Sequence, residues 1–249
     1  MRPARAAALL VLAALASLIL AACESTQETS RRLSTSAKAT LDVKGVTVTR
    51  RNKDIDVLSE TVLHDPNGVA AVVRLRNTGP AATTVPVVID VKDGKGKSLY
   101  SNTIPGLDPS LTSLSAIDRG QETFWVNNQI QTATAPRRLA AVVGVAPRAG
   151  ATLPRIVIGQ PAYGTDTSGL FARATISNRS KVAQRRLVVS CISRRGDRVV
   201  AAGRSIVEKL LPAPTPKPVS FRVYFIGNPK RGTLTCVAPP TVLPGGGTS

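Results

Sequence analysis

Short runs of alternating apolar and polar residues fill the sequence from residue 41 onward. In segments 85–91 and 187–191, apolar residues occupy every second position. A period of two places alternate side chains on opposite faces of a strand. Clusters of Gly, Pro, Asn and Asp separate the runs, as at 65–68 and 195–197. Such turns between short strands are typical of a sandwich or barrel, so the pattern predicts an all-β protein.

Helical periodicity is weak in the same region. Segment 107–117 comes nearest to it, but the segment is short and is interrupted by Pro109 and several serines. Because proline and serine disfavour a helix interior, we predict a loop with at most one helical turn there.

Two stretches of the chain carry the same features in the same order, which indicates an internal duplication. The paired segments are 72–78 with 173–179, 85–89 with 187–191, 124–126 with 221–223, and 145–147 with 237–239. Apolar positions fall on the same face in both copies, as a shared fold requires. We therefore predict two tandem β-sandwich domains at 41–149 and 150–242, followed by a flexible tail at 243–249.

The order of strands and turns resembles the FxLYD and CARDB-like families of immunoglobulin-like β-sandwiches in bacterial surface lipoproteins. The residues that carry the resemblance are Arg76-Asn77-Thr78-Gly79 with Asp93-Gly94, and Ser177-Asn178 with Arg195-Gly196-Asp197. The resemblance implies two immunoglobulin-like sandwiches that act as interaction or spacing modules.

The beginning of the chain has the organisation of an export leader. Arg2 and Arg5 precede an apolar run at 6–22 that contains no charge. The run ends in Leu20-Ala21-Ala22-Cys23, which resembles the lipobox, the signal of bacterial lipoproteins. The resemblance implies a signal peptide at 1–22 and a diacylglyceryl group, with acyl chains such as palmitate, on the sulfur of Cys23. A signal anchor with an incidental cysteine and simple secretion are the alternatives.

Two acyl chains suffice for stable membrane anchoring, whereas a single chain binds only marginally. Residues 23–40 form the lipidated cysteine and a tether rich in Ser, Thr and charge, which we predict to be flexible. The protein is therefore expected in the bacterial cell envelope, held by lipid on the non-cytoplasmic side of either the inner or the outer membrane.

With Cys23 lipidated, Cys191 and Cys236 remain. An even number of cysteines in an exported chain favours a disulfide. Closing that loop would stabilise the fold by about 4 kcal/mol on the chain-entropy estimate. The alternative is a pair of buried free thiols, because Cys191 aligns with the apolar residue Ile89.

The net charge of +18 is unevenly distributed. Residues 150–249 hold 15 basic and 3 acidic residues. A candidate basic face on consecutive predicted strands and their turn comprises Arg185, Arg186, Arg194, Arg195, Arg198 and Arg204. An anionic envelope polymer, a lipid headgroup or an acidic protein would suit such a face. An exported location and few aromatic residues for stacking argue against nucleic acid. The alternative is a solvated charge that reflects composition alone.

Catalytic and metal-binding patterns are not apparent in the sequence. The single histidine, His64, precedes a turn, and we interpret it as a surface residue. Asp54, Asp56 and Glu60 lack the spacing of a calcium loop and are interpreted as a solvated strand face. The sequence has no phosphate-binding glycine loop, nucleophile elbow or zinc-protease motif.

We therefore predict no catalytic activity, no metal and no cofactor. The expected role is that of a membrane-anchored envelope lipoprotein with a structural or protein-interaction function. The alternative is a binding protein that captures an anionic polymer, lipid or acidic partner through its basic second domain.

Overall fold

A computed structural model describes residues 45–212, 218–230 and 232–245. The predicted signal peptide, Cys23, the tether and part of the predicted tail lie outside these residues. The described chain is all-β and consists of antiparallel sheets, as the sequence predicts. None of its described helical segments has the length and apolar character required to cross a membrane.

The first module, residues 45–149, places two antiparallel sheets face to face around a core. One sheet has the order β1-β2-β6, and in the other β3 pairs with β4, β5 and β7. The strands are β1 (Ile55–Asp65), β2 (Gly68–Asn77), β3 (Ala82–Lys92), β4 (Ser98–Ser101), β5 (Ser113–Ile117), β6 (Glu122–Ile130) and β7 (Arg138–Val143). Their inward side chains, which include Leu75, Ile89 and Trp125, form one buried cluster.

The second module, residues 150–245, repeats this plan. One sheet joins β8 and β9 to β10 and then β13, and the other has the order β14-β12-β11-β15. The strands are β8 (Ile156–Ile158), β9 (Ala162–Asp166), β10 (Gly169–Asn178), β11 (Gln184–Arg195), β12 (Arg198–Leu210), β13 (Val219–Tyr224), β14 (Ile226–Gly227) and β15 (Thr233–Val237). Its own core contains Ile176, Leu187 and Phe221.

Two buried asparagines occupy the same position in the two modules. The Asn77 side chain donates to the carbonyl of Ile117 at the end of β5, over 3.4 Å. The Asn178 side chain donates over the same distance to the carbonyl of Leu210 at the end of β12. Each asparagine thus connects the end of one strand to the end of another strand in the facing sheet. This matched use supports the duplication inferred from the sequence.

A second matched feature lies in the backbone. Thr84 and Arg186 are the two non-glycine residues with positive φ in the described chain, and both have φ of 47°. Such a conformation is uncommon outside glycine. Each residue immediately precedes the first fully buried residue of the alternating run, Val85 in β3 and Leu187 in β11. The same local distortion therefore lies at the third residue of the corresponding strand in both modules.

The strand register corrects two of the segment pairs in the sequence alignment. Trp125 lies opposite Val73, and Phe221 lies opposite Ala174, so Trp125 is the counterpart of Phe221. The sequence alignment pairs Phe124 with Phe221 and is wrong by one residue. The cause is that β6 is apolar on both faces, so its period does not reveal which face is inward.

For the last strand of each module, the sequence alignment is wrong by more than one residue. Ala141 lies opposite Ile89, and Cys236 lies opposite Cys191. Ala141 is therefore the counterpart of Cys236, and pairing 145–147 with 237–239 is wrong. The similar Val-Ala-Pro strings follow the strand in the first module, whereas in the second module the string begins on its last residue.

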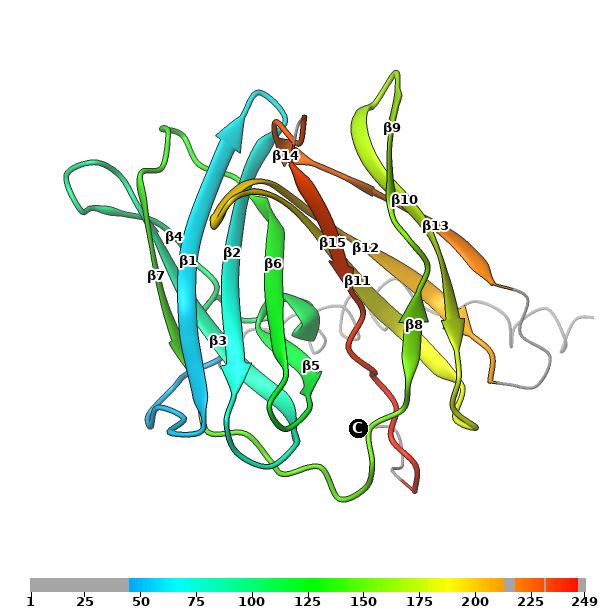
Figure 1. Ribbon diagram of the computed structural model, residues 1–249. Coiled ribbons are helices and arrows are strands. Elements are labelled where there is room, and N and C mark those ends of the chain that lie inside the picture. The colour runs from blue at the N-terminus through cyan, green and yellow to red at the C-terminus, as the bar shows by residue number, and fades with distance from the viewer. Residues whose placement is uncertain (1–44, 213–217, 231, 246–249) are drawn as a thin grey trace, which may run out of the picture. The chain divides into compact units, whose positions relative to one another are not determined.

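The two modules pack through the outer faces of their neighbouring sheets. Ala70, Val72, Phe124 and Val126 of the first module form a third buried cluster with Ile192, Val199, Ala202 and Ile226 of the second. Four sheets therefore lie in succession, with β1-β2-β6 against β14-β12-β11-β15 in the middle (Figure 1). By their contacts, the described residues form one compact unit.

Candidate functional site at the junction of the modules

An inserted segment of the first module reaches the second module. In the second module β12 is a continuous strand of 13 residues. In the first module the corresponding path is β4, then residues 102–112, then β5. Buried Asn102 fixes this insertion, because its side chain accepts from the Ile89 amide and donates to the Val87 and Leu111 carbonyls, each over 2.8 Å.

A single 3-10 turn, η1 (Pro109–Leu111), forms the tip of the insertion. Asp108 caps it by accepting from the Ser110 amide at 2.9 Å, and Pro109 stands at its first position. The prediction for 107–117 was a loop with at most one helical turn, and η1 is that turn. The prediction missed β5 (Ser113–Ile117), which forms the second half of that segment.

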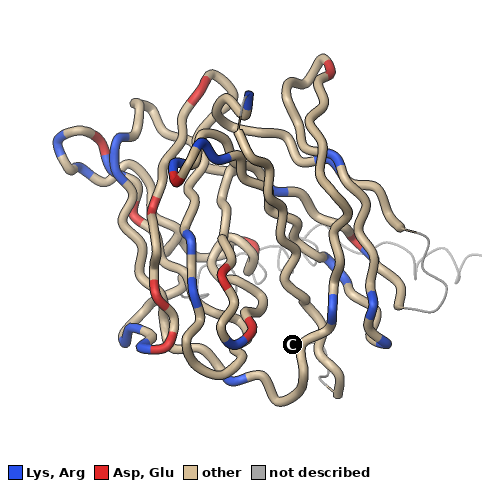
Figure 2. Tube along the Cα trace, in the orientation of Figure 1, with Lys and Arg blue, Asp and Glu red and all other residues tan. Residues whose placement is uncertain are grey.

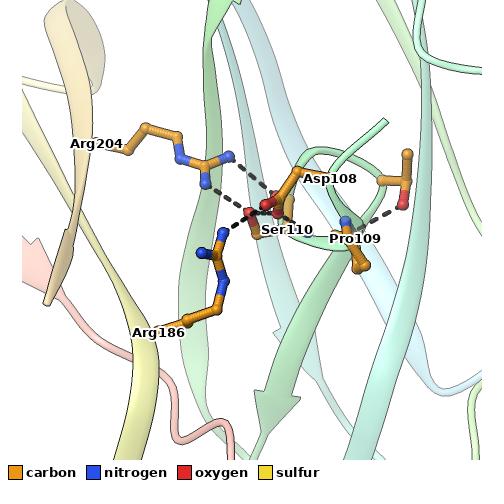
Figure 3. Close-up of polar contacts among 6 residues, drawn as sticks. Asp108, Pro109, Ser110, Arg186 and Arg204 are labelled. Atoms are coloured by element: carbon orange, nitrogen blue, oxygen red, sulfur yellow. Dashed lines mark hydrogen bonds and ion pairs between the residues drawn. The ribbon is translucent and has the colours of Figure 1, made fainter. Parts of the chain in front are cut away.

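Four side chains connect the modules at this tip (Figure 3). Arg186 donates to the Asp108 carboxylate at 2.7 Å. The Ser110 hydroxyl donates to the same carboxylate and accepts from Arg204 at 2.5 Å. Arg204 also donates to the Ser110 carbonyl at 3.2 Å, and the Trp125 indole donates to that carbonyl at 3.1 Å. Ser110 is thus hydrogen-bonded to side chains of both modules.

Asp108 and Arg204, the two charged partners of Ser110, both have lowered pKa values, but the causes differ. Burial would raise the pKa of the Asp108 carboxyl, but hydrogen bonds from Ser110 and the charge of Arg186 together hold that pKa below its ordinary value. The Arg204 residue is 8% exposed, and burial lowers its pKa although Asp108 opposes the change. Arg204 remains protonated because an arginine pKa starts so high. The junction therefore contains a buried cation that no carboxylate of the described residues contacts directly.

A cavity of about 290 Å³ opens beside this network, between the modules. The apolar part of its wall includes Leu114, Phe124, Trp125, Val188 and Ile206. Its polar part includes Asp108, Ser110, Ser190, Arg185, Arg186 and Thr241. The wall combines apolar residues with two arginines and one carboxylate, and a mainly apolar wall with a few polar groups is the general composition of a small-molecule site.

The six arginines of the predicted basic face do not lie together. Arg186 and Arg204 contact the insertion, and Arg204 is buried and so is absent from any exposed face. Arg185 is exposed at the cavity. Arg195 and Arg198 face each other at the exposed turn between β11 and β12. In Figure 2 the basic residues of the second module are spread along its strands.

Arg194 also lies toward the first module. Its charge helps to lower the pKa of the Glu122 carboxyl, which is lowered first by a hydrogen bond from Arg76. Its Nε atom is buried without a hydrogen-bond partner among the described residues. Three of the six arginines are therefore directed at the first module. No prediction about contacts between the domains was made from the sequence, so the sequence did not reveal this.

Cys191 and Cys236 form the predicted disulfide. The two residues are directly opposite each other on the neighbouring strands β11 and β15, with Cα atoms 4.1 Å apart. Cys191 is fully buried and belongs to the core of the second module. The bond holds edge strand β15 to its sheet. Cys23, the predicted lipidation site, lies outside the described residues.

The remaining candidates, His64 and the acidic residues near the start of β1, form no metal-binding group among the described residues. His64 stands near the end of β1, directly before Asp65, whose carboxylate accepts from the Gly227 amide of the second module at 2.7 Å. The Glu60 carboxylate accepts from the Ala141 amide of β7 at 2.7 Å, which is a structural contact. No group of three or more metal-binding side chains occurs among residues 45–212, 218–230 and 232–245.

No protein-family model matches this chain, and no curated protein matches it either. The site must therefore be interpreted from its own geometry.

Proposed function

We propose that this chain is a lipid-anchored protein of the bacterial cell envelope with a non-catalytic, structural or protein-interaction role. The observation that carries the proposal is the string Leu20-Ala21-Ala22-Cys23 at the end of a charged and then apolar leader. It resembles a lipobox at all four positions. A diacylglyceryl group on Cys23 would hold the double sandwich at a membrane surface.

Two features of the described residues support an exported, non-catalytic role. The Cys191–Cys236 disulfide fits an oxidising compartment outside the cytoplasm. The modules are coupled by a shared apolar cluster and by the Arg204–Ser110 contact, which suits a rigid element that presents surfaces to partners.

Metabolic labelling with a fatty acid tests the anchor. The full chain, expressed in a lipoprotein-processing bacterium, should take up the label and sediment with membranes. Cys23→Ser should lose the label and retain its uncleaved leader, whereas Ser25→Ala should behave as the wild type. Label on the Cys23→Ser chain would contradict the proposal.

A second candidate function is capture of an anionic polymer by the second module. The observation that favours it is the scarcity of acidic residues there: Asp166, Asp197 and Glu208 are the three acidic residues at 150–249. Asp166 is already engaged by Arg222 at 3.1 Å and by the Tyr224 hydroxyl at 2.8 Å. Exposed Arg195 and Arg198 then face solvent at one turn.

Retention of the full chain on an anionic polymer, measured over a series of salt concentrations, tests this candidate. We expect retention that weakens steeply with salt, because exposed charges are screened within about 10 Å at 0.1 M. Replacing both Arg195 and Arg198 with Gln should weaken retention, whereas replacing Arg138 of the first module should not. Equal retention of all three chains would remove this candidate.

A further inference from the structure

We propose that the cavity between the modules binds a small organic anion, with its carboxylate at Arg185 and Arg186 and its apolar group against Phe124 and Trp125. This inference is independent of lipid on Cys23. It also differs from polymer capture, because the site is a partly open cavity between the modules and not the turn between β11 and β12.

The charge balance of the junction is the first argument. Arg185 and Arg186 line the cavity, and Arg204 donates to Ser110, which also lines it. Asp108 is the one carboxylate in the described wall. Asp108 already accepts from Arg186 and from Ser110. Among the described residues, no ion pair involves Arg185. The positive charge therefore exceeds the negative charge where the cavity is polar.

The apolar wall of the cavity strengthens the electrostatic field of this excess positive charge. An apolar wall has low polarizability, so charges beside it are screened less than charges at an open surface. The guanidinium group presents a planar set of N–H donors that matches a carboxylate, and such charge-assisted hydrogen bonds are among the strongest in proteins. A carboxylate at Arg185 would supply the negative charge that the junction lacks.

The size and the remaining wall restrict the ligand. The volume of about 290 Å³ is at the lower end of small-molecule pockets, which span about 300–1,000 Å³. Leu114, Val188 and Ile206 add apolar surface next to the aromatic residues. The best match is therefore a carboxylate that carries a short apolar group and not a large or strongly polar anion.

Trp125 provides a direct reporter. It is the single tryptophan of the chain, it lines the cavity, and its indole is hydrogen-bonded to Ser110. The probe is hexanoate, which combines a carboxylate with a short chain and is transparent where tryptophan is excited. Acetate lacks the apolar chain, and hexanamide lacks the charge. Tryptophan emission of the full chain in detergent is titrated with each probe at constant ionic strength.

We expect a saturable change with hexanoate and binding at least about tenfold weaker with acetate or hexanamide, a difference of about 1.4 kcal/mol. Arg185→Gln should weaken hexanoate binding by about tenfold or more. Arg173→Gln removes the same charge from the same module at an exposed position of β10 outside the cavity wall and should leave binding unchanged; it also controls for partition of hexanoate into micelles. Near-ultraviolet circular dichroism of both variants confirms that they are folded.

Three results would overturn the inference. Equal binding of hexanamide would show an apolar cavity without anion selectivity. Equal binding of acetate would show an anion site without an apolar subsite. A hexanoate response that is absent, or that Arg185→Gln leaves intact, would show that the cavity is not the site.

Discussion

The two modules share a strand plan but hold corresponding strands together by different means. In the first module, Ile89 of β3 lies opposite Ala141 of β7, an apolar pair. In the second module, the corresponding pair is Cys191 and Cys236, joined covalently. The first module instead contains the insertion at 102–112, anchored by buried Asn102. One sandwich thus contains a disulfide, and the other contains a loop that contacts its neighbour.

The largest expected effect comes from removing the covalent difference. Replacing both Cys191 and Cys236 with Ala should lower the free energy of unfolding by about 4 kcal/mol, because the bond closes a loop of 45 residues in the unfolded chain. Urea denaturation, monitored through the emission of Trp125, measures whether the first module is destabilised as well. If the shared cluster couples the modules, the Trp125 transition shifts to lower urea although the bond lies in the second module.

A matched control is the wild-type protein under strong reductant, which should move to the same midpoint as the double variant. A Trp125 transition that stays in place while the second module unfolds earlier would show that the modules unfold independently.

The two asparagines test the similarity of the modules. Asn77→Ala and Asn178→Ala should each lower the free energy of unfolding by about 3 kcal/mol, since each leaves buried carbonyl groups without a donor. Thermal or urea unfolding of the two variants measures both changes in the free energy of unfolding. The effects should agree within about 1 kcal/mol, given the context dependence of such hydrogen bonds. A strong effect at one site and none at the other would contradict their equivalence.

The contrast between β2 and β3 shows what the sequence could and could not predict. β3 alternates between buried and less buried residues, so its face was evident from period two. β2 is buried on both faces from Val69 to Val73. A continuous apolar run is the signal of a strand covered on both sides. That run contained the information that another layer covers the first module, but periodicity alone does not identify the covering residues.

The candidate site was less predictable than the fold. The strand type and the disulfide were favoured by local pattern and cysteine count, and the structure confirms both. The Arg204–Ser110 contact joins residues 94 positions apart in different modules. It depends on which outer faces meet, and that is set by the summed packing of Phe124, Ile192 and their neighbours. A list of arginines in sequence order therefore grouped residues that the fold separates.

The shared cluster can be tested by one buried hydroxyl. Val72→Thr places a polar group between the modules and should lower the free energy of unfolding by about 1.5 kcal/mol, because a buried hydroxyl without a partner costs about 1–3 kcal/mol. Val88→Thr makes the same change at a half-buried position of β3, on the face that points away from the core of the first module. It should lower the free energy of unfolding by less than about 0.5 kcal/mol. Urea denaturation measures both. Equal costs would mean that the outer face of β2 is not covered in solution.

The smallest expected effect concerns the ion pair at the junction. The pKa of Asp108 is lowered in the folded protein by Ser110 and Arg186 against the opposing effect of burial. A lowered folded-state pKa gives stability that is present above the ordinary value of 3.8 and is lost as the pH falls through the folded-state value. Because the pair is partly exposed, the contribution should be at most about 1 kcal/mol.

Asp108→Asn removes this contribution, so the difference in unfolding free energy between wild type and variant should shrink as the pH is lowered from about 6 to about 3. Arg186→Gln should reduce the same pH dependence, since it removes the cation that favours the ionised carboxylate. Lys92→Gln, which alters the Asp90 pair within the first module, is the control and should leave it intact. A difference that stays constant or grows toward low pH would show that Asp108 stabilises the junction by its neutral hydrogen bonds. The contact between the modules would then depend on shape and hydrogen bonding and not on charge.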